Sequence, residues 1–299
     1  MNAAFSWNLL ADLRDMWSLP FMLNAFRAGT IVAVLAASVG WFMVLRRQSF
    51  AGHTLAVVGF PGAAAAVWLG ASIATGYFAV CIAAALVIAV LSRRGSRGYT
   101  EESAVIGTVQ AFALASGMLF IALYKGFLNG TNALLFGTFL GISASDVITL
   151  AVVAVIGLSV LAMIGRPLLF TSIDPDVARG RGMPTRALDT AFLLLLGAGA
   201  AEISQITGAL LVFALLVLPA ATAQLLSPRP VTSLAVSVLL AVLIVWAALF
   251  GAYYSPYPIG FWLTSIAFGL YVLAHTAVAV TSRLGRALPT GSVPARAAA

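Results

Sequence analysis

Long hydrophobic runs alternate along the chain with short polar gaps. A membrane-spanning helix needs about 20 mainly apolar residues to cross roughly 30 Å of hydrocarbon. Nine runs reach or approach this length: residues 21–45, 51–70, 77–91, 104–124, 146–165, 187–201, 206–226, 231–252 and 259–281. Lipid offers no partners to open backbone groups, and the sequence lacks the alternation typical of a membrane barrel. The pattern therefore predicts an all-α fold, a polytopic membrane helical bundle of about nine spans.

The polar gaps carry basic residues unequally. When the gaps are assigned to alternate sides, Arg14, Arg27 and Lys125 fall on one side, and the remaining 13 of the 16 Lys and Arg residues fall on the other. Cytoplasmic loops carry the excess of Lys and Arg in membrane proteins. We therefore predict an N-terminus outside, a C-terminus in the cytoplasm, and a location in the cell inner (plasma) membrane.

The chain divides into a membrane domain and two flanking segments. Residues 1–19 mix tryptophan with acidic and basic side chains, which is typical of a helix lying at the outer membrane interface. The transmembrane domain is predicted over residues 20–283, and residues 284–299, small and polar, are predicted to be a disordered cytoplasmic tail. The short apolar stretch 131–141 fits either a re-entrant turn or an outer loop.

The composition supports this class and excludes others. The chain is 62% hydrophobic and 8% charged, whereas a soluble domain carries roughly a quarter charged residues. The net charge of +7 lies in the gaps between spans, so we expect no nucleic-acid partner. Cys81 is the single cysteine, which rules out a thiolate metal cluster. The phosphate-binding motif G-x-x-x-x-G-K-[ST] does not occur, so any ATP hydrolysis is expected in a partner chain.

One polar gap, residues 172–184, has the pattern of a short helix. Its sequence is SIDPDVARGRGMP. Asp174 is a good N-cap and Pro175 fits the first helical position. Gly180 or Gly182 can adopt the left-handed conformation that closes a helix. From the residues alone, this helix is either a docking surface for another protein or a tight connector between two spans.

The same gap resembles the D-P-E-x-A-x-x-x-G segment of permeases in metal-type ABC importers, the zinc, manganese and ferrous-iron uptake systems. Four further stretches resemble motifs of that family and occur in its order. They are residues 46–62 (RRQSFAGHTLAVVGFPG), 101–119 (EESAVIGTVQAFALASGML), 134–146 (LLFGTFLGISASD) and 208–222 (GALLVFALLVLPAAT). Each motif is mostly apolar and identifies the family only weakly by itself. The five motifs in the family's order identify it with considerably more specificity.

The resemblance implies a permease subunit that is not itself an enzyme. Its expected partners are a cytoplasmic ABC ATPase dimer, a second permease copy (a homodimer is favoured), an extracytoplasmic metal-binding protein and membrane lipid. It also implies a helix at about 173–184 that couples the permease to the ATPase. The coupling residues carried over by the motif are Asp174, Pro175, Asp176, Ala178 and Gly182.

The sequence departs from the family at its D-A-L-S-H motif. The aspartate position is His53 here, and the histidine position is Val57. The resemblance makes that histidine a candidate transient metal ligand. His53 lies one helical turn before position 57, where the family has its histidine, and it offers an imidazole, which suits zinc, iron and nickel. Alternatively, His53 hydrogen-bonds locally near the start of the second span.

Four other residues are candidates for the translocation pathway. Glu202 and Gln205 fall in a predicted outer turn between the sixth and seventh runs, where Glu202 is either a metal ligand at the entrance or one of the polar side chains that any surface turn needs. Pro61 and Pro219 interrupt apolar spans, and they either line the pathway or bend helices for packing.

These features predict the membrane subunit of an ATP-driven importer of a divalent metal ion. Zinc is favoured from the family's commonest role, ahead of manganese and ferrous iron, and we expect no cofactor bound by this chain. An ABC permease for an iron-siderophore or corrinoid is the alternative, with a secondary transporter behind it. An intramembrane enzyme is disfavoured because the spans lack a convergent set of catalytic side chains.

Overall fold

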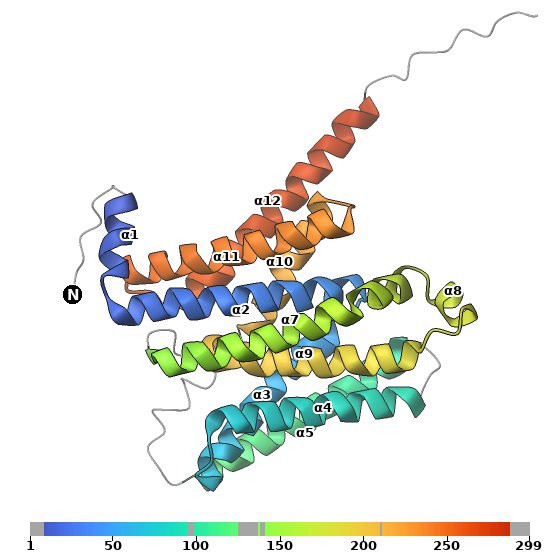
Figure 1. Cartoon of the computed structure of the whole chain (residues 1–299), viewed down its shortest axis with the longest axis horizontal. Coiled ribbons are helices and arrows are strands. Elements are labelled where there is room, and N and C mark those ends of the chain that lie inside the picture. The colour runs from blue at the N-terminus through green and yellow to red at the C-terminus, as the bar shows by residue number, and fades with distance from the viewer. Residues whose placement is uncertain (1–8, 95–98, 125–136, 138–140, 210, 288–299) are drawn as a thin grey trace, which may run out of the picture.

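The computed structural model describes residues 9–94, 99–124, 137, 141–209 and 211–287. This part of the chain is helical, and it contains no strand. Its helices are α1 (Leu9–Trp17), α2 (Pro20–Leu45), α3 (Ser49–Leu69), α4 (Ile73–Arg94), α5 (Tyr99–Leu123), α7 (Ala144–Ile173), α8 (Pro175–Gly180), α9 (Thr185–Thr207), α10 (Val212–Leu226), α11 (Pro230–Tyr254) and α12 (Ile259–Ala287). The long helices run roughly side by side, as Figure 1 shows.

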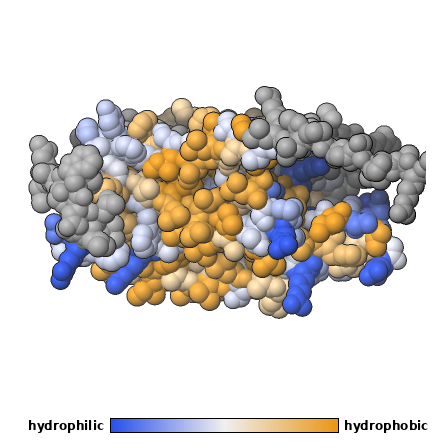
Figure 2. Space-filling view, turned by 90° about the horizontal axis from the view of Figure 1, so that it is seen from above, coloured by the Kyte–Doolittle hydropathy of each residue, from blue (hydrophilic) through white to orange (hydrophobic). Residues whose placement is uncertain are grey.

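The prediction of a polytopic helical bundle is confirmed. Eight helices of the described residues are long and apolar enough to cross a membrane, and the remaining predicted span, the seventh (206–226), corresponds to the shorter α10, of 15 residues. Apolar side chains form a broad central band, with hydrophilic ones toward the two ends (Figure 2). This distribution is the one that a bilayer requires, because the central band contacts hydrocarbon and the ends contact water and headgroups.

The boundary predicted between the sixth and seventh spans is wrong. The sequence placed residues 202–205 in an outer turn, but α9 continues as helix to Thr207. The break comes at Gly208, which has φ +72°, ψ 156°, a conformation that a residue with a Cβ rarely adopts. The helix therefore ends where glycine permits it, and Glu202 and Gln205 lie within α9.

The helices of the bundle form two groups, within which most of the helix–helix contacts lie. The first group is α3, α4, α5 and α9, and the second is α2, α10, α11 and α12, with α7 on α2 and α9. α3 and α4 approach closely at Gly62 and Gly76, where each glycine lies against the other's carbonyl oxygen. Small residues allow this approach, since association of helices in lipid depends on close packing rather than on the hydrophobic effect.

A methyl group at Gly62 should disrupt this contact. The added Cβ would lie 2.8 Å from the Cβ of Val80 and closer still to the backbone of Gly76. We expect Gly62→Ala to lower the stability of the detergent-solubilised protein by about 1–3 kcal/mol, the usual cost of overpacking. The matched control is Gly269→Ala on α12, where a Cβ meets nothing within 4 Å. Equal thermal stability of the two variants would contradict this packing.

The two ends of the bundle differ in what they carry. α1 lies at one end and α8 at the opposite end, together with the C-terminal part of α12 (Figure 1). This arrangement agrees with an odd number of crossings between α1 and α8. The interfacial role of residues 1–19 and the sidedness of the bundle stay predictions. The predicted tail at 284–299 and the stretch 131–141 fall mostly outside the described residues.

Candidate functional site

A short helix, α8, is present where the coupling helix is predicted, and its ends have the expected caps. Asp174 is the N-cap, and its Oδ1 accepts a hydrogen bond of 3.0 Å from the backbone N–H of Val177. Pro175 occupies the first helical position. At the other end, the N–H of Met183 donates to the carbonyl of Ala178, and Gly182 has φ +72°. This is the Schellman arrangement, so the sequence defines both ends of a rigid helix of six residues.

One face of α8 is buried and the other is exposed. Ala178 has no exposed surface, and α8 packs on α7 and α9. Ile173, at the end of α7, and Val177 are 66% and 44% exposed, although both are apolar. Asp176 forms an ion pair of 2.9 Å with Arg179 on the exposed side. The helix therefore presents an apolar ridge at one end of the bundle.

A buried arginine connects the helices that hold α8. Arg46, at the end of α2, donates from Nη1 to Ser172 Oγ of α7 at 3.0 Å and forms an ion pair with Asp189 of α9. Its guanidinium also lies 5.5 Å from the centre of the Phe192 ring. Arg46 is thus the common partner of the two helices on either side of α8. We call Arg46, Ser172 and Asp189 the Arg46 cluster.

This cluster was not predicted from the sequence. Arg46 was interpreted only as a charge that sets topology and as part of a family motif, and Ser172 and Asp189 were not singled out. A signal was available, because Asp189 is an acid within two turns of the start of an apolar span. Such a residue usually has a partner inside the bundle.

His53 lies on a face of α3 that points toward α10. Its imidazole ring is 4.9 Å from the ring of Phe213, nearly edge-on, and both residues are half-buried. The next residues point elsewhere: Thr54 donates to Gln110 of α5 at 2.9 Å, and the Leu55 carbonyl accepts from Cys81 of α4. Nδ1 of His53 has no hydrogen-bond partner among the described residues. Nδ1 is also buried, so this polar atom is left unsatisfied on the α3–α10 face.

Glu202 is fully buried in α9, not at a surface turn. Neither carboxylate oxygen has a hydrogen-bond partner in the described part of the chain. Gln205, one turn further on, is half-buried and shares its side of the helix. Because an uncompensated carboxylate at membrane depth is costly, this position is a functional candidate on physical grounds.

The structure does not bring Glu202 and His53 together. A Cβ built on Gly59 of α3 would lie 3.4 Å from Ser204 Oγ of α9, so Gly59 and Ser204 lie at the same height along the bundle. His53 is six residues, or about 9 Å, further along α3. Glu202 also points about 160° away from Ser204 around α9, since each residue turns the helix by about 100°. The two residues cannot ligate one ion in this conformation.

The two prolines occupy different surroundings. Pro61 is buried within α3 and lines an apolar groove of about 780 Å³ between α3, α4 and α5. Pro219 is buried within α10. Among the described residues no contact joins either proline to His53, so their predicted place on the pathway stays a prediction.

The described residues contain no group of three or more His, Cys, Asp and Glu side chains able to hold a metal ion. Stable binding of a first-row metal usually takes three or four such ligands.

The comparisons with known proteins agree with this architecture. The model of the ABC 3 transport family matches residues 18–278. The chelated iron transport system membrane protein YfeC of Yersinia pestis is 30% identical, over 90% of this chain and 88% of its own. The manganese transport system membrane protein MntC of Halalkalibacterium halodurans is 27% identical, over 83% of each chain.

A solved structure shares the fold. PsaBC from Streptococcus pneumoniae, in complex with a Fab, superposes with a TM-score of 0.79 at 24% identity, over 89% of this chain and 95% of the matched chain. The permease family expected from the sequence motifs is thus confirmed by an independent family model and by relatives that cover most of the chain. The chain belongs to the ABC 3 transport family and is a multi-pass inner-membrane permease subunit of an ABC transporter.

Proposed function

We propose that this chain is the membrane-spanning subunit of an importer of a divalent transition-metal ion, driven by separate cytoplasmic ATPases. The observation that carries the proposal is α8, a capped helix with a buried base at Ala178 and an exposed apolar ridge at Ile173 and Val177. A rigid helix transmits the movement of a bound motor, whereas a flexible loop would absorb it. The ridge supplies the apolar surface that a groove on the ATPase would bury.

The residues Asp174, Pro175, Asp176, Ala178 and Gly182 then have distinct roles. Asp174, Pro175 and Gly182 set the ends of the helix, and Ala178 seats it on α7 and α9. Asp176 lies on the exposed side, where it can contact the partner. This division explains why the motif contains residues of such different kinds.

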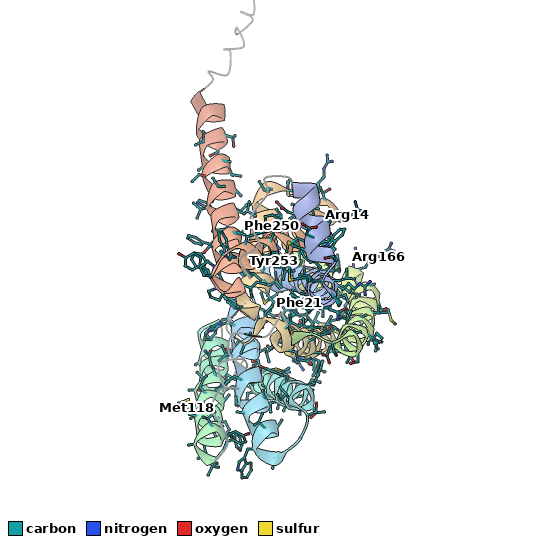
Figure 3. The ribbon with its side chains drawn as sticks, turned by 90° about the vertical axis from the view of Figure 1, so that its left-hand side faces the viewer. Arg14, Phe21, Met118, Arg166, Phe250 and Tyr253 are labelled. Atoms are coloured by element: carbon teal, nitrogen blue, oxygen red, sulfur yellow. The ribbon has the colours of Figure 1, made fainter. Side chains whose placement is uncertain are left out.

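The translocation pathway is proposed to follow the α3–α10 face. His53 is half-exposed there, and an imidazole directed at lipid would be unfavourable. Exposed apolar helices flank this face: α5 and α12 lie on the same side of the bundle, with Met118 of α5 pointing outward (Figure 3). A second copy of the chain would cover the face and enclose a pathway between the two subunits. This is the support for a homodimer.

His53→Ala should reduce uptake without affecting assembly. We expect metal accumulation to fall about tenfold, which corresponds to about 1.4 kcal/mol lost from one ligand in the rate-limiting state. Recovery of the ATPase with the tagged chain should be unchanged, since His53 belongs to neither α8 nor the Arg46 cluster. The matched control is His275→Ala on α12. Equal uptake by both variants would remove His53 from the pathway.

The identity of the ion is the finer part of the proposal. Zinc was favoured by the resemblance alone, while the relatives are named for manganese and for chelated iron. These names support testing manganese and iron ahead of zinc. Neutral nitrogen and oxygen ligands, such as His53 and backbone carbonyls, are compatible with all three ions.

The test is uptake of radioactive manganese, iron and zinc by cells that express the complete transporter, each supplied free and as a chelate. The proposal predicts that one free divalent ion accumulates and that the other two compete weakly. Accumulation of the chelate alone would favour the iron-siderophore alternative. Accumulation of none of them would contradict metal transport.

A further inference from the structure

A groove of about 460 Å³ opens between α1, α2, α7 and α11. This surface lies near the α1 end of the bundle. α1 and α7 are on the opposite side from α5 and α12, as Figure 3 shows. The proposed subunit interface is thus elsewhere, and the groove faces the surrounding membrane. Its lining is apolar except for Thr30 and Arg27 of α2.

One wall of the groove is a rigid aromatic cluster. The rings of Trp17, Phe26 and Trp246 meet edge to face, with centroid separations of 6.3, 6.2 and 5.5 Å. The indole N–H of Trp246 donates to Thr30 Oγ1 at 2.9 Å, which fixes its orientation. Tryptophan is enriched at the level of lipid headgroups, because its ring is apolar and its N–H is polar. The cluster therefore suits the boundary between headgroup and acyl chain.

Arg27 is the one charged side chain among the described residues that line this groove. It is exposed, and it takes part in neither of the two ion pairs found among the described residues, Arg46–Asp189 and Arg179–Asp176. The acid next to the lining residue Val147 is Asp146, whose Oδ2 accepts hydrogen bonds from the backbone N–H and the hydroxyl of Ser143 at 3.0 and 2.6 Å. Asp146 is thus occupied in capping α7.

We propose that this groove binds an anionic phospholipid, with the phosphate on Arg27 and an acyl chain along the apolar wall. A guanidinium pairs with a phosphate through two parallel hydrogen bonds, and the pair is strong where water is scarce. The charge and the apolar surface lie in one groove, which matches the two parts of a lipid. Free phosphate would use the charge alone.

The proposed lipid would also hold α1 in place. Trp17 is the last residue of α1, which packs on α2 and, through the Trp17 ring, on Trp246 of α11. A lipid between Trp17, α7 and α11 would extend that contact. Loss of the lipid should therefore lower the stability of this end of the bundle.

The test uses the transporter purified through this chain in detergent and stripped of lipid. Phosphatidylglycerol, phosphatidylcholine or inorganic phosphate is added, and the thermal unfolding midpoint is measured. We expect phosphatidylglycerol to raise the midpoint by about 3 °C or more in the wild type, as a ligand of the native state does. The rise should be lost in Arg27→Gln and kept in Arg14→Gln, a charge removed from the same end of the bundle.

Two further variants keep the test decisive if Arg27→Gln does not fold. Arg27→Lys preserves the charge and should retain a smaller rise, whereas Ile31→Phe fills the groove beside Arg27 and should lose it. Equal stabilisation of Ile31→Phe and wild type by phosphatidylglycerol would overturn the site. Equal stabilisation by inorganic phosphate, or by phosphatidylcholine, would overturn the assignment to an anionic lipid.

Discussion

A Val177→Asp variant is expected to lose its ATPase partner. Val177 is 44% exposed on α8, and burial of a carboxylate in an apolar groove without a partner is strongly unfavourable. Each 1.4 kcal/mol lost from association weakens binding tenfold. We expect recovery of the ATPase with the tagged chain to fall by about tenfold or more, and metal uptake to fall with it.

The control for this variant is at the same position. Val177→Leu keeps an apolar side chain on the exposed side of α8. It should retain most of the bound ATPase. If Val177→Asp recovers as much ATPase as Val177→Leu, then α8 is not the docking helix, although the permease fold would stand.

Arg46→Gln is expected to separate ATPase binding from transport. The Arg46 cluster ties α2 to α7 and α9, which hold α8, but it does not belong to the exposed ridge. The ATPase should therefore still co-purify. Metal uptake should fall about tenfold, since movement of α8 would no longer reach α2 through a fixed contact. The measurement is uptake and ATPase recovery on the same preparation.

Arg47→Gln is the matched control, because Arg47 is adjacent and exposed. A double-mutant cycle of Arg46→Gln with Asp189→Asn isolates the pair, since residues in contact give non-additive effects. We expect the double variant to be little worse than Arg46→Gln alone. Additive losses, or uptake by Arg46→Gln equal to that of Arg47→Gln, would contradict the role of the cluster.

The helices could be predicted from the sequence because their lengths are set by the bilayer. The runs at 21–45 and 231–252, for example, correspond to α2 (Pro20–Leu45) and α11 (Pro230–Tyr254) with shifts of one or two residues. The break between α9 and α10 was misplaced because polar residues in AEISQ suggested a surface turn. The glycine conformation at position 208 and the burial of Glu202 depend on tertiary packing, which hydropathy does not report.

The candidate site was predictable to different degrees. α8 follows from local rules of capping, and its residues were identified from the sequence. The Arg46 cluster joins residues more than 100 positions apart, at separations of 126 and 143. No local pattern contains such a contact. The face of α3 on which His53 lies was likewise set by its neighbours α4, α5 and α10.

On the proposed function, a motor bound at α8 drives metal through the bundle. The most direct test of this function is metal accumulation in proteoliposomes that contain the complete transporter and its external binding protein. We expect metal to move only when ATP is present on the side of the membrane where α8 lies, and Val177→Asp to abolish this movement. Accumulation that is the same without ATP, or with ATP confined to the opposite side, would contradict the proposed function.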